Sequence, residues 1–285
     1  QGVSSAASDV YKRQTGPPGA GKSTLISELV KYFDDAKTKI GVILCDPTSP
    51  ESGGAILGDR IRLQDSFLNP NIFVRSIPNY RADGGVSPLV GVVTSLLAAC
   101  DYEVVLVESV GVGQNEFDLA CISDILIVAL VPESGDSIQT MKSGIIEIAD
   151  IFVVNKSDRD EATRLVNSLE TTLNLIETKT SRIPEVLMTQ AHRDKGIISL
   201  YSAILEHRKF MESDCNLEEH RHLRRKNEFS RILKEFLGNE IDQIIYKNEN
   251  LKNVVKKVER NELDPYTAAI HIINNQISLE ISGSL

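Results

Sequence analysis

The sequence predicts an α/β protein: a mostly parallel sheet with helices on both faces, followed by a C-terminal helical extension. Three observations predict it. A glycine-rich loop at 16–24 is typical of a strand-to-helix connection, and continuous apolar runs then alternate with amphipathic helices. Near Met211 the composition becomes charged and helical. Uninterrupted apolar strands are typical of parallel sheets that are buried on both faces.

The individual elements follow from these apolar runs. The first helix, after the glycine-rich loop, carries Leu25, Ile26 and Leu29 on one face, and six strands are predicted at 40–45, 72–77, 104–107, 125–131, 151–154 and 186–188. Further helices are predicted at 86–99, 138–149, 161–175 and 196–210. The C-terminal part carries one apolar stripe of Leu223, Phe229, Ile232, Leu233 and Phe236, and a second of Leu251, Val254, Val255 and Val258. We expect these stripes to pack on the core or on a second subunit.

The N-terminus does not fit this pattern. Residues 1–14 read QGVSSAASDVYKRQ, which is polar and small where an apolar strand should precede the loop. We therefore expect that the natural first strand is missing, or that an unrelated stretch has been joined at about Gln14. The expected organisation is an atypical segment at 1–14, an α/β domain at 15–210 and a helical extension at 211–285 that mediates dimerisation.

Composition narrows the classes of partner. The chain has 285 residues and a net charge of −9, which argues against nonspecific binding to nucleic acid or to an anionic membrane. Its longest apolar run, at 125–131, is too short to span a bilayer. The four cysteines are scattered without a CxxC pair, so we expect a reducing, cytoplasmic location. They are Cys45, Cys100, Cys121 and Cys215.

The most informative motif is GPPGAGKST at 16–24, which matches the phosphate-binding pattern G-x-x-x-x-G-K-[ST]. Glycines let successive backbone N–H groups curl around phosphate oxygens, Lys22 supplies a cation, and Ser23 offers a hydroxyl to Mg²⁺. A plain strand-to-helix turn is the alternative interpretation. The residues predicted to bind the nucleotide here are Gly16, Gly19, Ala20, Gly21, Lys22, Ser23 and Thr24.

A second motif indicates the base. Residues 155–158 read NKSD directly after a predicted strand, and the carboxylate of Asp158 can accept hydrogen bonds from N1–H and the 2-amino group of guanine. Adenine offers no such donor pair. A solvated turn would be the default for this tetrapeptide alone, but its position after a phosphate-binding loop favours GTP. Asn155 and Lys156 belong to the same motif, and the backbone of Gln190 and Ala191 is expected to hold guanine O6.

Carboxylates at other strand ends predict Mg²⁺. Glu108 and Gly111, in ESVG, stand where many GTPases carry D-x-x-G, and the longer glutamate favours contact with the metal through water. Asp46 and Asp59 lie on a glycine-rich stretch, where a surface loop is the alternative. Val112 replaces the water-orienting glutamine of several GTPases, so we expect slow intrinsic hydrolysis. The predicted metal ligands are Ser23, Asp46, Asp59 and Glu108, and the predicted catalytic residues are Lys22, Asp59 and Glu108.

Together, GPPGAGKST, DPTSPESGGAILGDR, ESVGVGQNE, GDSIQTMKSGIIEIADIFVVNKSD and the C-terminal helices closely resemble the MeaB/ArgK-type G proteins. The resemblance runs from about Thr15 to Ile273. It implies a dimeric, Mg²⁺-dependent GTPase that gates adenosylcobalamin delivery to an acyl-CoA mutase, such as methylmalonyl-CoA mutase, and protects it. It also implies a third switch at 136–142, although helix capping explains that segment equally well. Two departures are the absence of the family's N-terminal helices and first strand, and Gln190 in place of a serine.

Other functions remain open at this point. A nickel-insertion GTPase would share the nucleotide site, but such proteins bring Cys and His ligands that this chain lacks. A kinase acting on periplasmic amino-acid-binding transport proteins is an older label for the family, and no phosphoacceptor site is evident. A scaffold that binds GTP without turnover is the last alternative. No nucleic-acid or membrane partner is expected.

Overall fold

The computed structural model describes residues 10–15, 19–47, 69–79, 87–109, 123–132, 144–175, 182–213 and 216–273. It divides into two compact units, Gln1–Glu228 and Phe229–Leu285. The division therefore falls within a long helix, α7 (Asn216–Lys247), and not at residue 210, where the change in composition placed it.

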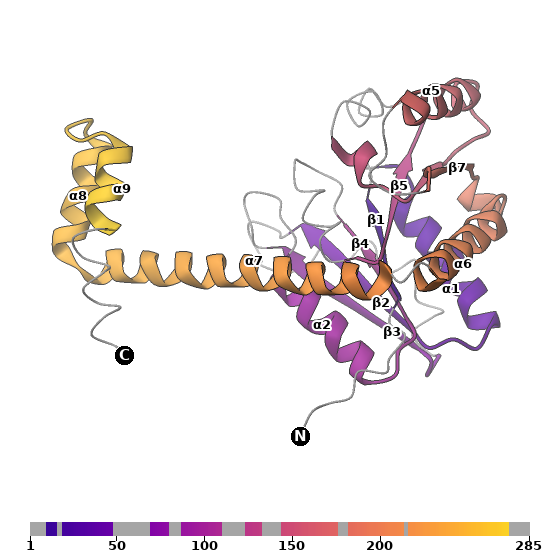
Figure 1. Ribbon diagram of the computed structural model, residues 1–285, viewed down its shortest axis with the longest axis horizontal. Helices are drawn as coiled ribbons and strands as arrows, with labels where there is room; N and C mark the ends of the chain where they lie inside the picture. The colour runs from indigo at the N-terminus through magenta and orange to yellow at the C-terminus, as the bar shows by residue number, and fades with distance from the viewer. Residues whose placement is uncertain are drawn as a thin grey trace. The chain divides into compact units, whose positions relative to one another are not determined.

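The first unit is built on one seven-stranded sheet in which every described pairing is parallel (Figure 1). The strand order is β3-β2-β4-β1-β5-β6-β7. The strands are β1 (Val10–Thr15), β2 (Ile40–Pro47), β3 (Ile72–Asn79), β4 (Val104–Glu108), β5 (Ile125–Leu130), β6 (Ile151–Val154) and β7 (Glu185–Met188). The prediction of a parallel sheet is confirmed, and all six strands predicted from apolar runs are present within a few residues of their expected ends.

Strand β1 corrects the expectation for the N-terminus. Residues 10–15 form the central strand of the sheet, paired with β4 on one side and with β5 on the other. The alternative of a missing first strand was wrong, because it required an apolar sequence, whereas the alternative of a joined, unrelated stretch stays a prediction. Parallel pairing is made by backbone N–H and C=O groups, which every residue except proline carries in full. A polar sequence such as VYKRQT can therefore occupy the strand position between two apolar neighbours.

Helices cover both faces of the sheet, as predicted. Residues of α1 (Lys22–Asp35) and α6 (Ile197–Ser213) join one buried cluster, and these two helices lie side by side in Figure 1. Residues of α2 (Pro88–Ala99), α5 (Ala162–Leu175) and the short 3₁₀ helix η2 (Gly144–Glu147) join the cluster on the opposite face. The remainder of the helix expected at 138–149 lies outside the described residues. Because both faces are covered, β4, β5 and β6 are buried along their whole length.

The sheet order fixes where a ligand can bind. From β1 the chain crosses to β2 and β3 on one side, and it later returns to β5, β6 and β7 on the other side. This reversal makes the carboxyl end of β1 a topological switch point, where a crevice opens in sheets of this kind. The glycine-rich loop follows β1 directly, so it lies at that crevice.

The second unit is helical, as predicted. It contains the C-terminal part of α7, α8 (Glu249–Glu259) and α9 (Pro265–Ile272). Leu251 and Ile272 are its buried centre, with Ile241, Ile244, Ile245 and Val254 packed around them. By contrast, Phe229 and Phe236 on α7 are exposed. A search of the described helices for one with the length and hydropathy of a membrane span found none.

Candidate functional site

Helix α1 begins directly after the glycine-rich loop, at the carboxyl edge of the sheet. Gly19 and Gly21 have positive φ angles of 77° and 85°, a conformation that only glycine adopts without strain. Gly21 caps the helix without a side-chain hydrogen bond, and its carbonyl accepts the first helical bond from Leu25 N at 2.9 Å. The first N–H groups of a helix have no partner within the helix, and together with the helix dipole they attract anions. Lys22, which is 5% exposed, adds a positive charge at the same place.

A hydroxyl and a carboxylate meet beside this helix start. Ser23 Oγ donates a hydrogen bond to Glu108 Oε1 at 2.8 Å. The two residues come from the first turn of α1 and from the carboxyl end of β4, so two predicted metal ligands that are 85 positions apart lie together. Hard oxygen donors of this kind fit Mg²⁺, which is usually held by one or two protein oxygens and by substrate phosphates.

Asn155 joins two loops through its side-chain amide. It follows β6, is 3% exposed, and its Nδ2 donates to the carbonyl of Ala20 at 2.8 Å. Its Oδ1 accepts from Thr189 Oγ1 and from Ala191 N, both at 3.1 Å. The polar atoms of Asn155 are therefore used within the protein, and they hold the glycine-rich loop against the loop after β7.

Two neighbouring features reinforce this connection. Lys156 Nζ donates to the carbonyl of Gly19 at 2.8 Å, which is a second link from the NKSD motif to the glycine-rich loop. A Cβ at Gly21 would collide with Asn155 Nδ2, so the close approach of the two segments requires glycine there. Asp158 is left as the exposed carboxylate of the motif.

The loop at 189–196 is fixed by its own backbone and by α1. Gln190 and Lys195 form an antiparallel bridge, and Asp194 has a left-handed backbone with a φ angle of 54°. Tyr32 Oη, on α1, lies 3.2 Å from each carboxylate oxygen of Asp194. Burial and this hydrogen bond raise the pKa of Tyr32 above its ordinary value of 10.0. The loop at 189–196 is thus attached to the helix that begins at the glycine-rich loop.

Not every predicted site residue can be placed. Gly16, Asp59, Gly111 and the segment 136–142 lie outside the described residues. Asp46 lies at the carboxyl end of β2, with its backbone opposite Pro78, and its side chain is outside the description. Other predicted residues lie at the carboxyl edge of the sheet or in the segments that follow its strands: Lys22, Ser23, Glu108, Asn155, Lys156, Gln190 and Ala191.

Sequence reasoning missed three participants. The hydroxyl of Thr189 donates a hydrogen bond to Asn155, while Tyr32 and Asp194 connect α1 to the loop at 189–196. Thr189 stands directly before two predicted nucleotide-binding residues, and this adjacency was the only signal for it. Nothing in the sequence pairs Tyr32 with a residue 162 positions away.

Comparison with known proteins places this geometry in a family. The model of the methylmalonyl-CoA mutase-associated GTPase MeaB matches residues 10–245. A GTPase of Pyrococcus abyssi is 39% identical over 266 residues, covering 92% of this chain and 82% of that protein. The GTPase ArgK of Escherichia coli is 32% identical over 262 residues, covering 89% of this chain and 78% of that protein.

A solved structure described as a LAO/AO transport system kinase has the same fold. Its TM-score is 0.64 at 23% sequence identity, and the match covers 93% of this chain and 80% of that one. The family model and these relatives show that the chain is a GTPase with a P-loop fold. It belongs to the MeaB family of methylmalonyl-CoA mutase-associated GTPases.

Proposed function

We propose that this GTPase is a Mg²⁺-dependent switch that controls adenosylcobalamin delivery to an acyl-CoA mutase, with methylmalonyl-CoA mutase as the partner, and protects that enzyme. The observation that carries the proposal is the family match over residues 10–245, because the family's description names association with this mutase. The fold and the paired Ser23 and Glu108 support a switch that works through the nucleotide.

The residues would divide the work of hydrolysis as follows. The N–H groups in the first turn of α1 and the ammonium of Lys22 would bind the phosphates, and Ser23 with Glu108 would hold the metal. A bound Mg²⁺ would supply positive charge that offsets the negative charge of the phosphates. Asp46 and Asp59 are proposed as further metal or water contacts. Water attacks the γ-phosphorus as the bond to the β–γ bridging oxygen breaks, which yields GDP and inorganic phosphate.

The base would be bound beside the two loops that Asn155 joins. Its three hydrogen bonds hold the glycine-rich loop and the loop at 189–196 in place. Asp158 would accept the two guanine N–H groups, and the backbone at Gln190 and Ala191 would meet O6. In this arrangement Asn155 is a positioning residue, while Asp158 determines specificity.

We further propose that the chain is a homodimer. Phe229, Leu233 and Phe236 follow one another at helical spacing on α7, and each is between 44% and 67% exposed. Large apolar side chains that share a helix face are commonly covered by a partner helix. Sedimentation at micromolar concentration should therefore give twice the mass of the chain, and Phe236→Glu should give the monomer.

The test of the switch measures GTP hydrolysis with and without purified methylmalonyl-CoA mutase. The expected result is slow hydrolysis by the chain alone and at least a tenfold increase with the mutase. Lys22→Ala should abolish tight GTP binding and the stimulated rate, whereas Lys31→Ala, an exposed lysine that pairs with Glu28 on the same helix, should change neither. No stimulation, together with no co-purification in the presence of a non-hydrolysable GTP analogue, would exclude the mutase as partner.

A kinase function is not proposed. Its support is the description of a solved structure that is 23% identical, and a likeness of this degree extends only to the fold. A nickel-insertion role likewise has no observation at the described site in its favour.

A further inference from the structure

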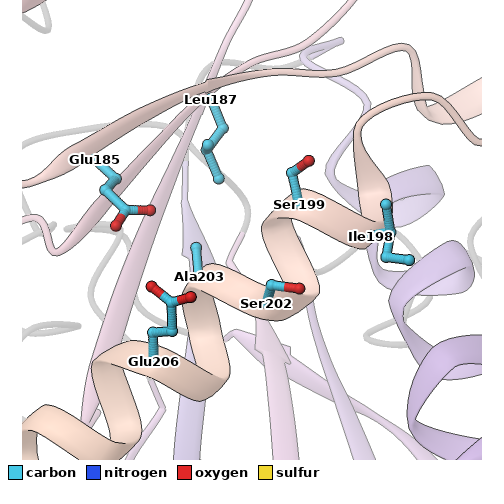
Figure 2. A pocket seen from close by; sticks show the side chains of 7 residues that line it. All are labelled: Glu185, Leu187, Ile198, Ser199, Ser202, Ala203 and Glu206. Atoms are coloured by element: carbon cyan, nitrogen blue, oxygen red, sulfur yellow. The ribbon is translucent and has the colours of Figure 1, made fainter.

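An open groove of about 310 Å³ lies between the edge strand β7 and helix α6 (Figure 2). Two residues of β7 line one wall, at alternate positions that share one face of the strand. Five residues of α6 line the other wall, at spacings that share one face of the helix. The lining residues are Glu185, Leu187, Ile198, Ser199, Ser202, Ala203 and Glu206.

The groove is hollow because its helical wall is built from small side chains. Ser199, Ser202 and Ala203 stand where larger residues would fill the space between helix and strand. Elsewhere on α6, Leu200 and Ile204 are fully buried and close the same helix against the sheet. The hollow is therefore local to the outer edge of the sheet.

Among the described strands, β7 forms the edge of the sheet at this groove. In the order of the described strands it is the last, and it pairs with β6 alone. The outward N–H and C=O groups of an edge strand are a template for an added strand from another chain. Apolar side chains surround the edge, with Ile198 60% and Met188 49% exposed.

The charge of the groove indicates what would occupy it. The carboxylates of Glu185 and Glu206 point toward one another from the two walls (Figure 2). Glu185 Oε1 lies 2.6 Å from Arg182 Nη2, whereas among the described residues Glu206 has no hydrogen bond or ion pair. Arg182 offsets the charge of Glu185, so the net negative charge of the groove comes from Glu206, which attracts a cation and disfavours a phosphate.

We propose that the groove docks an extended segment of a partner protein, which adds a strand beside β7 and places a lysine or arginine side chain between Glu185 and Glu206. The groove also has a direct connection to the GTP site. β7 ends at Met188 and α6 begins at Ile197, so the loop at 189–196 joins the two walls. Any change in GTP affinity on docking must be matched by an equal change in affinity for the segment.

In the test, nine-residue peptides that bind the full chain are selected from a random displayed library. The selected peptides are then synthesised, and their affinity for the chain is measured by titration. The selected peptides should carry lysine or arginine among alternating apolar residues, and they should protect the amide hydrogens of β7 from exchange. Glu206→Lys reverses the charge and Ser202→Leu fills the hollow, so each should weaken binding at least tenfold. Glu212→Lys, on the same helix but outside the groove, should bind within twofold of the wild type.

Three results would overturn the proposal. The first is a selection that yields no binder, or yields binders without a basic residue. The second is that Glu206→Lys, Ser202→Leu and Glu212→Lys all bind the peptides with the same affinity. The third is binding of spermidine as tight as that of the peptides, which would indicate a small-cation site without strand addition. GTP affinity in the absence of peptide serves as the folding control, and Glu206→Gln, with a smaller expected loss, replaces any variant that fails it. The test is independent of whether the mutase is a partner.

Discussion

Replacing Asn155 with alanine tests the connection between the two nucleotide loops. The change removes three hydrogen bonds that a side chain only 3% exposed makes to Ala20, Thr189 and Ala191. At about 1 kcal/mol for each bond, the chain should lose about 3 kcal/mol of stability. For a domain of this size that corresponds to a fall in the melting temperature of about 6–12 °C.

The assay is thermal unfolding of the nucleotide-free chain, followed by circular dichroism, together with calorimetric titration of GTP. GTP affinity should fall by more than the tenfold that about 1.4 kcal/mol represents, because both loops lose their shared support. Asn167→Ala, at an exposed site on α5, is the matched control and should leave both quantities unchanged. If Asn155→Ala unfolds within about 2 °C of the wild type, the three bonds do not stabilise the fold as argued.

Four further outcomes are expected. Gly21→Ala should abolish GTP binding, since its Cβ collides with Asn155, whereas Gly238→Ala, where a Cβ meets nothing within 4 Å, should stabilise its helix slightly on thermal unfolding. Asp158→Asn should move preference from GTP to XTP in competition titrations, and unchanged preference would contradict the assigned role. Tyr32→Phe should speed release of bound GDP a few-fold. Because the pKa of Tyr32 is raised, the stabilisation by its hydroxyl should be present below pH 10.0 and disappear as the pH rises through the higher folded-state pKa. The hydrogen bond from Thr267 lowers the pKa of Asp264, so the ionised carboxylate should stabilise α9 above pH 3.8 and lose this effect as the pH falls through the lower folded-state pKa. The loss should be seen as a fall in helical circular dichroism, and Asp264→Asn should largely lack this pH dependence.

Much of the sheet could be predicted because burial leaves a direct trace in the sequence. β5 and β6 are apolar at every position, since both of their faces are covered. β1 left no such trace, because its place in the sheet depends on backbone pairing with β4 and β5. The order of the strands is also not local information. The strand order depends on which strands pair in the folded chain, and the pattern of apolar residues along the sequence does not specify that pairing.

The site shows the same division. The proximity of Ser23 and Glu108 could be predicted, because each belongs to a motif at the same edge of the sheet. The role of Asn155 could not be predicted fully. Its motif indicated a contact with the base, whereas the structure uses its amide to hold Ala20, which is 135 positions away. Hydrogen bonds that join distant segments impose no spacing on the sequence.

The central position of β1 has a consequence for the order of assembly during synthesis. The phosphate loop is synthesised before the segments that support it, because β1 pairs with β4 and β5, and the loop is held by Asn155. Contacts between segments so far apart form late, because the intervening chain must first be made and closed into a loop. GTP therefore cannot bind a completed site until these later segments have been made. It can act only as a late ligand, one that selects chains already synthesised beyond Ala191.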